Sequence, residues 1–248
     1  MVAPESHLYF VVLVDIEDSS HRPDSVQSVL NQGVYDVVTS ALKRAGVDFR
    51  DELTSDRGDG MLIMLPPTLS PPTLLRELVR GLDDALSGHR RAHNDAYRMR
   101  LRVGLQTGLV ARDGNRWTGT TINELHQLVG SDEVRQALKG ADHANMVFVV
   151  PDSLYTGVVE GHHPGIDPAA YVPFDFVTKH RVTRRGWLTL PGSPGTPGDP
   201  AADGRSGTPG TPRTPGGTGG AGMRFENNGT NHGTVVQGAH VHGNTFGR

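Results

Sequence analysis

The stretch Leu8-Tyr9-Phe10-Val11-Val12-Leu13-Val14-Asp15-Ile16 begins the part of the chain that decides its fold, and Arg57-Gly58-Asp59-Gly60-Met61-Leu62-Ile63-Met64-Leu65 continues it. Each stretch sets an aspartate, Asp15 or Asp59, at or beside the end of an apolar run that is typical of a buried β-strand. If the two strands lie side by side, the two carboxylates meet at one point of the sheet.

Two convergent carboxylates suit a hard cation such as Mg²⁺, which proteins typically hold through one or two carboxylates together with substrate phosphates. Neither motif contains a cysteine or a histidine. The pair therefore favours a nucleotide–metal site. The alternative is structural, because an aspartate after a strand often caps the next helix and Asp-Gly is a common hairpin turn.

The composition limits the classes of protein to consider. The chain has 248 residues, a net charge of −3 and no cysteine. This charge offers no basic surface for a nucleic acid, and the lack of cysteine excludes disulfides and thiolate zinc sites. The apolar run near the N-terminus is too short for a signal peptide or a membrane span. We therefore expect a cytoplasmic protein with no nucleic-acid partner and no membrane.

The hydrophobic periodicity predicts strands that alternate with helices. Strands are expected over residues 8–14, 61–65, 101–110 and 146–150, helices over 26–45, 73–96, 121–128, 131–138 and 152–159, and a closing hairpin over 174–177 and 187–190. Four prolines, Pro66, Pro67, Pro71 and Pro72, are expected to break the chain before the second helix. The order favours an α/β (α+β) domain over residues 1–190, with one sheet covered by helices. Periodicity alone leaves the strand order open.

Two further segments follow this domain. Residues 191–222 contain 18 Gly or Pro among 32 residues and no large apolar side chain, which predicts a disordered linker. Residues 223–248 lack proline, and residues 233–247 carry no Lys, Arg, Asp or Glu. Such an uncharged, β-prone segment on a tether is typical of self-association. The alternatives are an inert tail or a metal site at His232, His240 and His242.

A third motif completes the set: Gly104-Leu105-Gln106-Thr107-Gly108, followed by Gly119-Thr120-Thr121-Ile122-Asn123 at the start of a predicted helix. Taken in order, the three motifs resemble the catalytic domain of class III adenylate/guanylate cyclases over residues 7–190, and most closely small actinobacterial cyclase-like proteins. The resemblance implies a ferredoxin-like α/β sandwich. It also implies a homodimer with composite active sites that acts on a nucleoside triphosphate.

The resemblance also assigns roles to residues. Asp15 and Asp59 would hold two Mg²⁺ or Mn²⁺ ions, one to help deprotonate the ribose 3′-hydroxyl and one to neutralise the triphosphate. Asn123 of the other subunit would position the ribose, and Lys179 would reach the triphosphate. The backbone that begins at Ile16 and runs through Ser19 and Ser20 would turn its N–H groups onto a phosphate as a helix begins.

Several positions depart from the family pattern. Gln127 stands where the family has an arginine that stabilises charge in the transition state. Asp18 replaces a glycine and adds negative charge beside the expected phosphates. Ser55 and Arg116 align with the pair that reads adenine and do not repeat its donor–acceptor pattern, so the base stays open. Arg57 is either the missing cation or a surface residue.

The tail carries a resemblance of its own. Gly233-Thr234-Val235-Val236-Gln237-Gly238 resembles the short amyloid-signalling motifs of bacterial immune and cell-death proteins, which recruit a partner protein that bears a like motif.

Two functions follow for the whole chain. The first is a cyclase that makes a 3′,5′-cyclic nucleotide and pyrophosphate in bacterial signalling or defence. The second is a catalytically weak nucleotide-binding sensor or adaptor that signals through its tail.

Overall fold

The structure is a computed structural model that describes residues 4–50, 53–56, 60–114, 116–179 and 181–192. Arg57 and Asp59 of the second motif lie outside the described residues, and so do residues 193–248, which hold nearly all of the expected linker and the whole C-terminal segment. What the sequence predicts for them stays a prediction.

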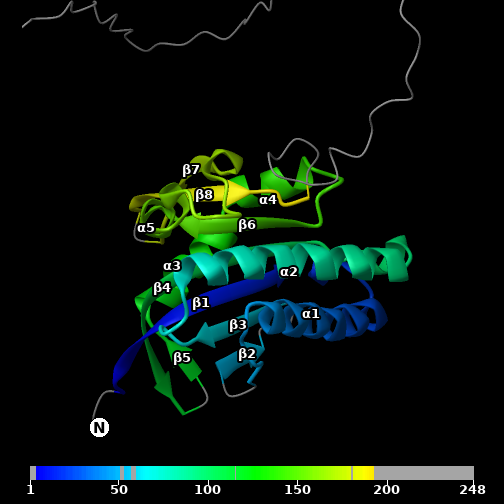
Figure 1. The fold of residues 1–248 in the computed structure, drawn as a ribbon. Coiled ribbons are helices and arrows are strands. Elements are labelled where there is room, and N and C mark those ends of the chain that lie inside the picture. Colours follow the sequence, from blue (N-terminus) through cyan, green and yellow to red (C-terminus); the bar gives the residue numbers. More distant parts are fainter. Residues whose placement is uncertain (1–3, 51–52, 57–59, 115, 180, 193–248) are drawn as a thin grey trace, which may run out of the picture. The chain divides into compact units, whose positions relative to one another are not determined.

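The described residues form a mixed α+β fold around one sheet (Figure 1). Its strands are β1 (Ser6–Ile16), β2 (Thr54–Asp56), β3 (Gly60–Leu65), β4 (Leu101–Asp113), β5 (Arg116–Thr118), β6 (Met146–Pro151), β7 (Val172–Val177) and β8 (Thr183–Thr189). The helices are α1 (Asp24–Arg44), α2 (Pro71–Ala92), α3 (Thr120–Val129), α4 (Asp132–Lys139) and α5 (Asp152–Gly157), and the short 3₁₀ turn η1 (Ser19–His21) precedes α1. The predicted fold class is confirmed.

The strand order, which periodicity left open, is β2-β3-β1-β4-β6-β8-β7, with β5 paired to β4. The pair β4–β6 is parallel, whereas β1 pairs antiparallel with both β3 and β4. The two strands that carry the first two motifs therefore lie side by side, as the sequence required for a shared site. The strands β7 and β8 form the predicted closing hairpin.

The continuous apolar run of β1 is explained by burial on both faces of the sheet. Phe10, Val12 and Val14 pack with the residues of α1 and α2 in one core cluster. Val11 and Leu13 point to the other face and join a second cluster with α3 and α4. Successive side chains of a strand alternate between its faces, so a strand covered on both sides reads as uninterrupted apolar sequence.

Small residues set how closely the helices approach. A Cβ added at Gly81 of α2 would lie 2.8 Å from the Cα of Ala41 in α1. A Cβ at Gly104 of β4 would lie 2.5 Å from the side chain of Val129 in α3, and one at Gly108 would lie 2.2 Å from the Oγ1 of Thr121. The glycines of the third motif therefore let α3 pack directly on β4.

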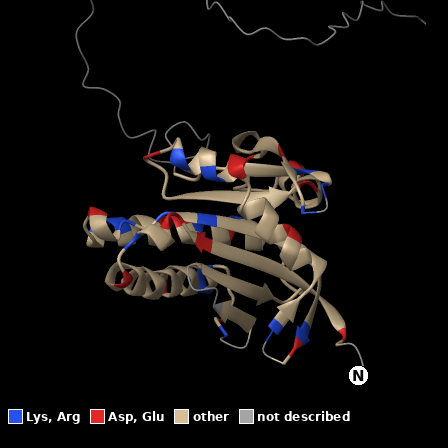
Figure 2. Ribbon diagram, turned by 180° about the vertical axis from the view of Figure 1, so that it is seen from behind, with Lys and Arg blue, Asp and Glu red and all other residues tan. Residues whose placement is uncertain are grey.

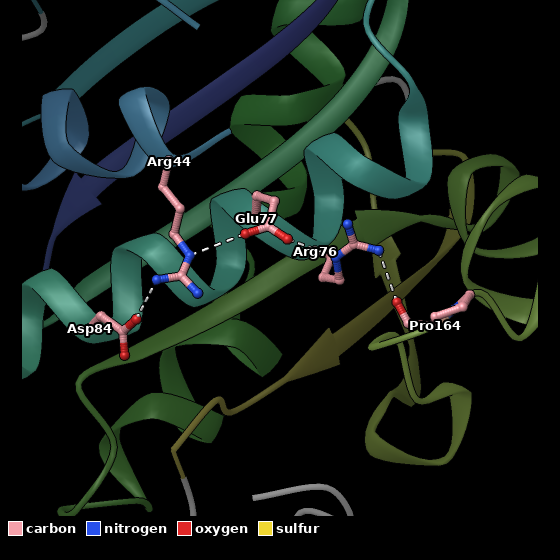
Figure 3. Close-up of polar contacts among 5 residues, drawn as sticks. All are labelled: Arg44, Arg76, Glu77, Asp84 and Pro164. Atoms are coloured by element: carbon pink, nitrogen blue, oxygen red, sulfur yellow. Dashed lines mark hydrogen bonds and ion pairs between the residues drawn. The ribbon is translucent and has the colours of Figure 1, made fainter. Parts of the chain in front are cut away.

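A polar network joins α1, α2 and a loop near residue 164 (Figure 3). The Arg44 guanidinium lies 3.1 Å from Glu77 and 3.0 Å from Asp84, and Arg76 lies 2.8 Å from Glu77. Arg76 also donates a hydrogen bond of 3.0 Å to the Pro164 carbonyl. The Arg76 hydrogen bond, assisted by Arg44 and opposed by burial, lowers the pKa of Glu77. The network ties the C-terminal end of α1 to α2, and α2 to the loop at Pro164.

Two details differ from the sequence expectation. Pro71 and Pro72 do not separate the helix from the chain before it but form its first turn, where a missing N–H costs nothing. The strands β2 and β5 were not predicted, because each spans only three residues and carries no readable period. Among the described residues no helix is long and apolar enough to cross a membrane.

We predict opposite effects for two alanine substitutions in α2. Gly81→Ala forces a methyl group into the Ala41 backbone and should lower the free energy of unfolding by about 1–3 kcal/mol. Gly88→Ala meets no atom within 4 Å and should raise it, since alanine favours a helix over glycine by about 1 kcal/mol. Urea denaturation of both variants measures the difference; equal effects would contradict the close helix contact.

Candidate functional site

Asp15 lies one residue before the end of β1 and pairs across the sheet with Gly60, the first residue of β3. A Cβ on Gly60 would lie 2.1 Å from the Val14 carbonyl oxygen, so only glycine fits this close approach. Asp59 precedes Gly60 in the chain but lies outside the described residues. The register thus brings the two sequence motifs to one point of the sheet.

On its other side, Asp15 pairs with Arg102 of β4. The Arg102 guanidinium forms an ion pair with the Asp15 carboxylate, and the side chains are 14% and 24% exposed, respectively. Arg102 was not among the predicted site residues. Its signal was the alternation of charged and apolar residues at the start of β4, which places Arg102 on the Asp15 face once the register is known.

A second ion pair lies beside the first. Arg100 is 3.3 Å from Glu17, and the Arg100 carbonyl accepts a 2.9 Å hydrogen bond from the Glu17 N–H. The buried Arg100 guanidinium also donates to the carbonyl of Leu138 and, at 3.1 Å, to that of Ala141, both at the end of α4. Arg100 therefore ties the segment after Asp15 to α4 through its backbone and its side chain.

The segment that was expected to face a phosphate begins in the strand rather than in a helix. Ile16 is the last residue of β1, and its side chain is buried in the core. Asp18 then takes a left-handed conformation, with φ 53° and ψ 28°, before η1. Ser19 is buried, Ser20 is exposed, and α1 begins only four residues later. The expected direct entry into a helix is replaced by a short 3₁₀ turn.

This backbone conformation explains the departure at Asp18. The left-handed region is the one that glycine enters freely, and aspartate and asparagine are the side chains that enter it most often besides glycine. Aspartate at position 18 therefore keeps the turn that the family glycine would make. The substitution changes the local charge more than the local shape.

The three predicted catalytic residues lie together on another part of the fold. The Gln127 side chain of α3 donates a 3.0 Å hydrogen bond to the Asn123 carbonyl. The same side chain accepts a 2.7 Å hydrogen bond from the Lys179 N–H, just after β7. Gln127 thus joins the helix that carries Asn123 to the segment that carries Lys179.

This group is separate from Asp15 within one chain. Thr121 at the start of α3 packs against Gly108, which pairs with Tyr9, six residues along β1 from Asp15. At the rise of a β-strand this is a separation of about 20 Å. The helix α3 then runs toward Asp15, because Leu125 and Val129 pack at Gly104, which pairs with Leu13. Asn123 lies near the distant start of this helix, two residues after Thr121.

The two positions aligned with the base-reading pair are also apart. Ser55 of β2 pairs with Leu62, two residues along β3 from Gly60 and on the same face as Asp15. Arg116 pairs with Asp113 in the β4–β5 hairpin and is exposed. That hairpin lies beyond the N-terminal end of β1, at the opposite end of the β1–β4 ladder from Asp15. The structure brings Ser55, but not Arg116, to the Asp15 region.

The described residues that could hold a metal are few. They contain no group of three or more histidine and acidic side chains placed to hold an ion. Asp15 offers a partly exposed carboxylate next to the start of β3, and Glu17 offers another two residues later. This suits a cation that takes one or two carboxylates and completes its shell with phosphates and water.

The charges around this site are local. Figure 2 shows Lys and Arg interspersed with Asp and Glu over the described elements. A groove of about 630 Å³ between α1 and α2 lies on the other side of the sheet, among residues such as Gly33, Asp36, His89 and His93. It contains none of the predicted site residues. At the candidate site itself, the described charges include two ion pairs, Asp15–Arg102 and Glu17–Arg100.

Comparisons with known proteins give the fold a name. No protein-family model matches the chain, and no curated protein matches its sequence. The solved structure of the guanylyl cyclase Cya2 is similar, with a TM-score of 0.52 and 10% identity over 76% of this chain and 94% of that one. This likeness establishes a nucleotide-cyclase fold for the described domain and, at this identity, the fold alone.

Two other solved structures score slightly lower. An adenylate/guanylate cyclase/hydrolase from Silicibacter pomeroyi has a TM-score of 0.48 and 17% identity, over 75% of this chain and 98% of that one. The dimeric guanylyl cyclase domain of the RhoGC fusion protein from the aquatic fungus Blastocladiella emersonii has a TM-score of 0.46 and 15% identity, again over 75% and 98%.

We predict that Asp18 is held in its turn at a cost to stability. Asp18→Gly should raise the free energy of unfolding by about 0.5–1 kcal/mol, since glycine adopts φ 53° without strain. Asp18→Ala should lower it by about 1 kcal/mol, because alanine has neither that freedom nor a polar side chain to support the turn. Chemical denaturation measures the stability of the two variants. Equal stability would contradict the left-handed turn at Asp18.

Proposed function

We propose that this chain is a divergent nucleotide cyclase, a metal-dependent homodimer that converts a nucleoside triphosphate into a 3′,5′-cyclic nucleotide and pyrophosphate. One observation carries the proposal. Asp15 pairs with Gly60, the residue that follows Asp59, on a sheet with the fold of a guanylyl cyclase. The fold supplies the reaction class, and this register supports a shared role for the two carboxylates.

In this proposal Asp15 and Asp59 are the carboxylates that hold Mg²⁺ or Mn²⁺. When bound, the two ions supply activation of the ribose 3′-hydroxyl and neutralisation of the triphosphate. The chain contributes a fixed frame, because Asp15 sits inside a strand that is paired on both sides. Ser19 and Ser20 belong to the turn that follows, where their N–H groups would bind a phosphate.

Arg102 supplies the cation that the departure at Gln127 removes. Its guanidinium already lies against Asp15 on the proposed phosphate face. A guanidinium binds phosphate oxygens through two parallel hydrogen bonds and stays charged at any working pH. Arg57 is a second candidate from the sequence motif. The negative charge of Asp18 opposes them and is expected to weaken nucleotide binding.

The second half of the site comes from the other copy of the chain. Asn123 would position the ribose, and Lys179 would contact the triphosphate. The separation of about 20 Å between the start of α3, where Asn123 lies, and Asp15 supports this arrangement, because a second copy could supply Asn123 to the Asp15 face. A two-fold dimer would form two such sites.

The base is left open in this proposal. A purine edge is read by a paired donor and acceptor, and Ser55 and Arg116 do not form such a pair within one chain. A pyrimidine or a relaxed preference is therefore as consistent with these residues as ATP or GTP.

We predict a cyclic product when purified protein is incubated with Mn²⁺ and each of the four ribonucleoside triphosphates in turn. Asp15→Asn, Asp59→Asn and Asn123→Ala should each lower the rate by a factor of about 10² or more, since each removes a metal ligand or a substrate contact. Arg135→Gln, a surface change in α4, is the matched control and should leave the rate unchanged. Product formation is measured by chromatography, and absence of product from all four nucleotides would contradict the proposal.

A second candidate function rests on Gln127. Both polar atoms of its side chain are engaged within the fold, with Asn123 and Lys179, so this residue acts as a structural link rather than a free catalytic group. A protein that binds nucleotide and turns over poorly would then be a sensor or adaptor. It would melt at a higher temperature with metal and nucleotide while forming no product.

The C-terminal residues 223–248 would carry the output of such a sensor. We propose that this segment, tethered by residues 191–222, recruits a partner protein with a like motif, because a flexible tether raises the effective concentration of its end. Light scattering of the full chain and of a chain that ends at Gly222 measures this. Equal self-association of the two would contradict it.

A further inference from the structure

The two neighbouring ion pairs at the end of β1 are built differently. Arg100 is held by Glu17 and by two carbonyls at the end of α4, so its guanidinium is fixed from several directions. Arg102 forms its ion pair with Asp15, and no carbonyl contact like those of Arg100 accompanies that pair among the described residues. The Arg102 guanidinium is therefore the less firmly anchored of the two and the one that can be exchanged.

Asp15 is at the same time the carboxylate proposed as a metal ligand. A guanidinium and a divalent cation both need its oxygen atoms, and the side chain is only 24% exposed. A partly buried carboxylate gains much from a single cation, and two cations at one carboxylate repel each other. The guanidinium and the divalent cation therefore compete for the Asp15 carboxylate.

We propose that Arg102 acts as a built-in competitor that occupies the Asp15 carboxylate in the metal-free protein and must be released before a divalent cation binds there. The inference rests on the proposed function, since it takes Asp15 as a metal ligand. It gives Arg102 a second role beside phosphate binding, which is to set the affinity of the site for metal.

The competition has a consequence for the order of binding. A cation that arrives alone must displace Arg102 and leave a partly buried guanidinium without a counter-ion, which is unfavourable. A cation that arrives with phosphates brings the anion that the released guanidinium needs. Arg102 therefore couples the affinity for metal to the presence of the anion, and such coupling is reciprocal.

The experiment is a titration of the full chain with Mn²⁺ alone, in which the paramagnetic resonance signal of free Mn²⁺ reports binding. Arg102→Gln removes the competitor and should lower the Kd for Mn²⁺ roughly tenfold. Arg102→Lys keeps the charge but loses the planar fork, so its Kd should fall by a factor of about 3. Arg100→Lys is the matched control in the neighbouring pair and should stay within about twofold of the original chain.

Asp15→Asn separates the failure of this inference from the failure of the proposed function. If Asp15→Asn loses Mn²⁺ binding while both Arg102 variants bind as the original chain does or more weakly, the competition is wrong and the metal site stands. If Asp15→Asn binds Mn²⁺ as the original chain does, or if no variant binds it, Asp15 is not a metal ligand and both proposals fall. Thermal melting checks that each variant is folded. If Arg102→Gln does not fold, the Kd of Arg102→Lys for Mn²⁺ decides the test.

Discussion

The backbone pairing of β1 with β3 on one side and β4 on the other is the constraint on which the rest of the site depends. It sets Asp15 between Gly60 and Arg102, so one row of the sheet carries a carboxylate, a guanidinium and the start of the segment that follows Asp59. A slip of one residue in either pairing would turn Asp15 into the core beneath α1 and α2. Such a slip is costly because it would bury the Asp15 carboxylate among apolar side chains.

The packing of α3 against β4 supports this row of residues. The glycines of β4 let α3 lie against the strand, and the third sequence motif thereby acquires a structural meaning. Arg100, just before β4, binds both Glu17 and carbonyls near the end of α4, and thereby holds the chain after Asp15. The helices α1 and α2 are joined by a separate polar network around Glu77. The site is thus framed by paired strands and buried polar contacts rather than by a loop alone.

Much of this fold was readable from the sequence, since the apolar periods gave the main strands and helices and the three motifs gave the family likeness. The site was readable only in part. Arg102 was missed because its meaning depends on the β1–β4 register, a long-range property that no local pattern reports. The turn at Asp18 was missed for a related reason: a left-handed backbone is visible in a sequence as a glycine, and here the glycine is replaced.

The central claim is that the site is completed by two copies of the chain, with Asp15 from one and Asn123 from the other. Mixing two inactive variants, Asp15→Asn and Asn123→Ala, tests it most directly. Half of the dimers would then pair unlike chains, and each of these would hold one intact site of two, so the mixture should recover about a quarter of the original rate of cyclic nucleotide formation. Exchange of subunits between the two variants is verified first. If the rate then does not recover, the account is contradicted.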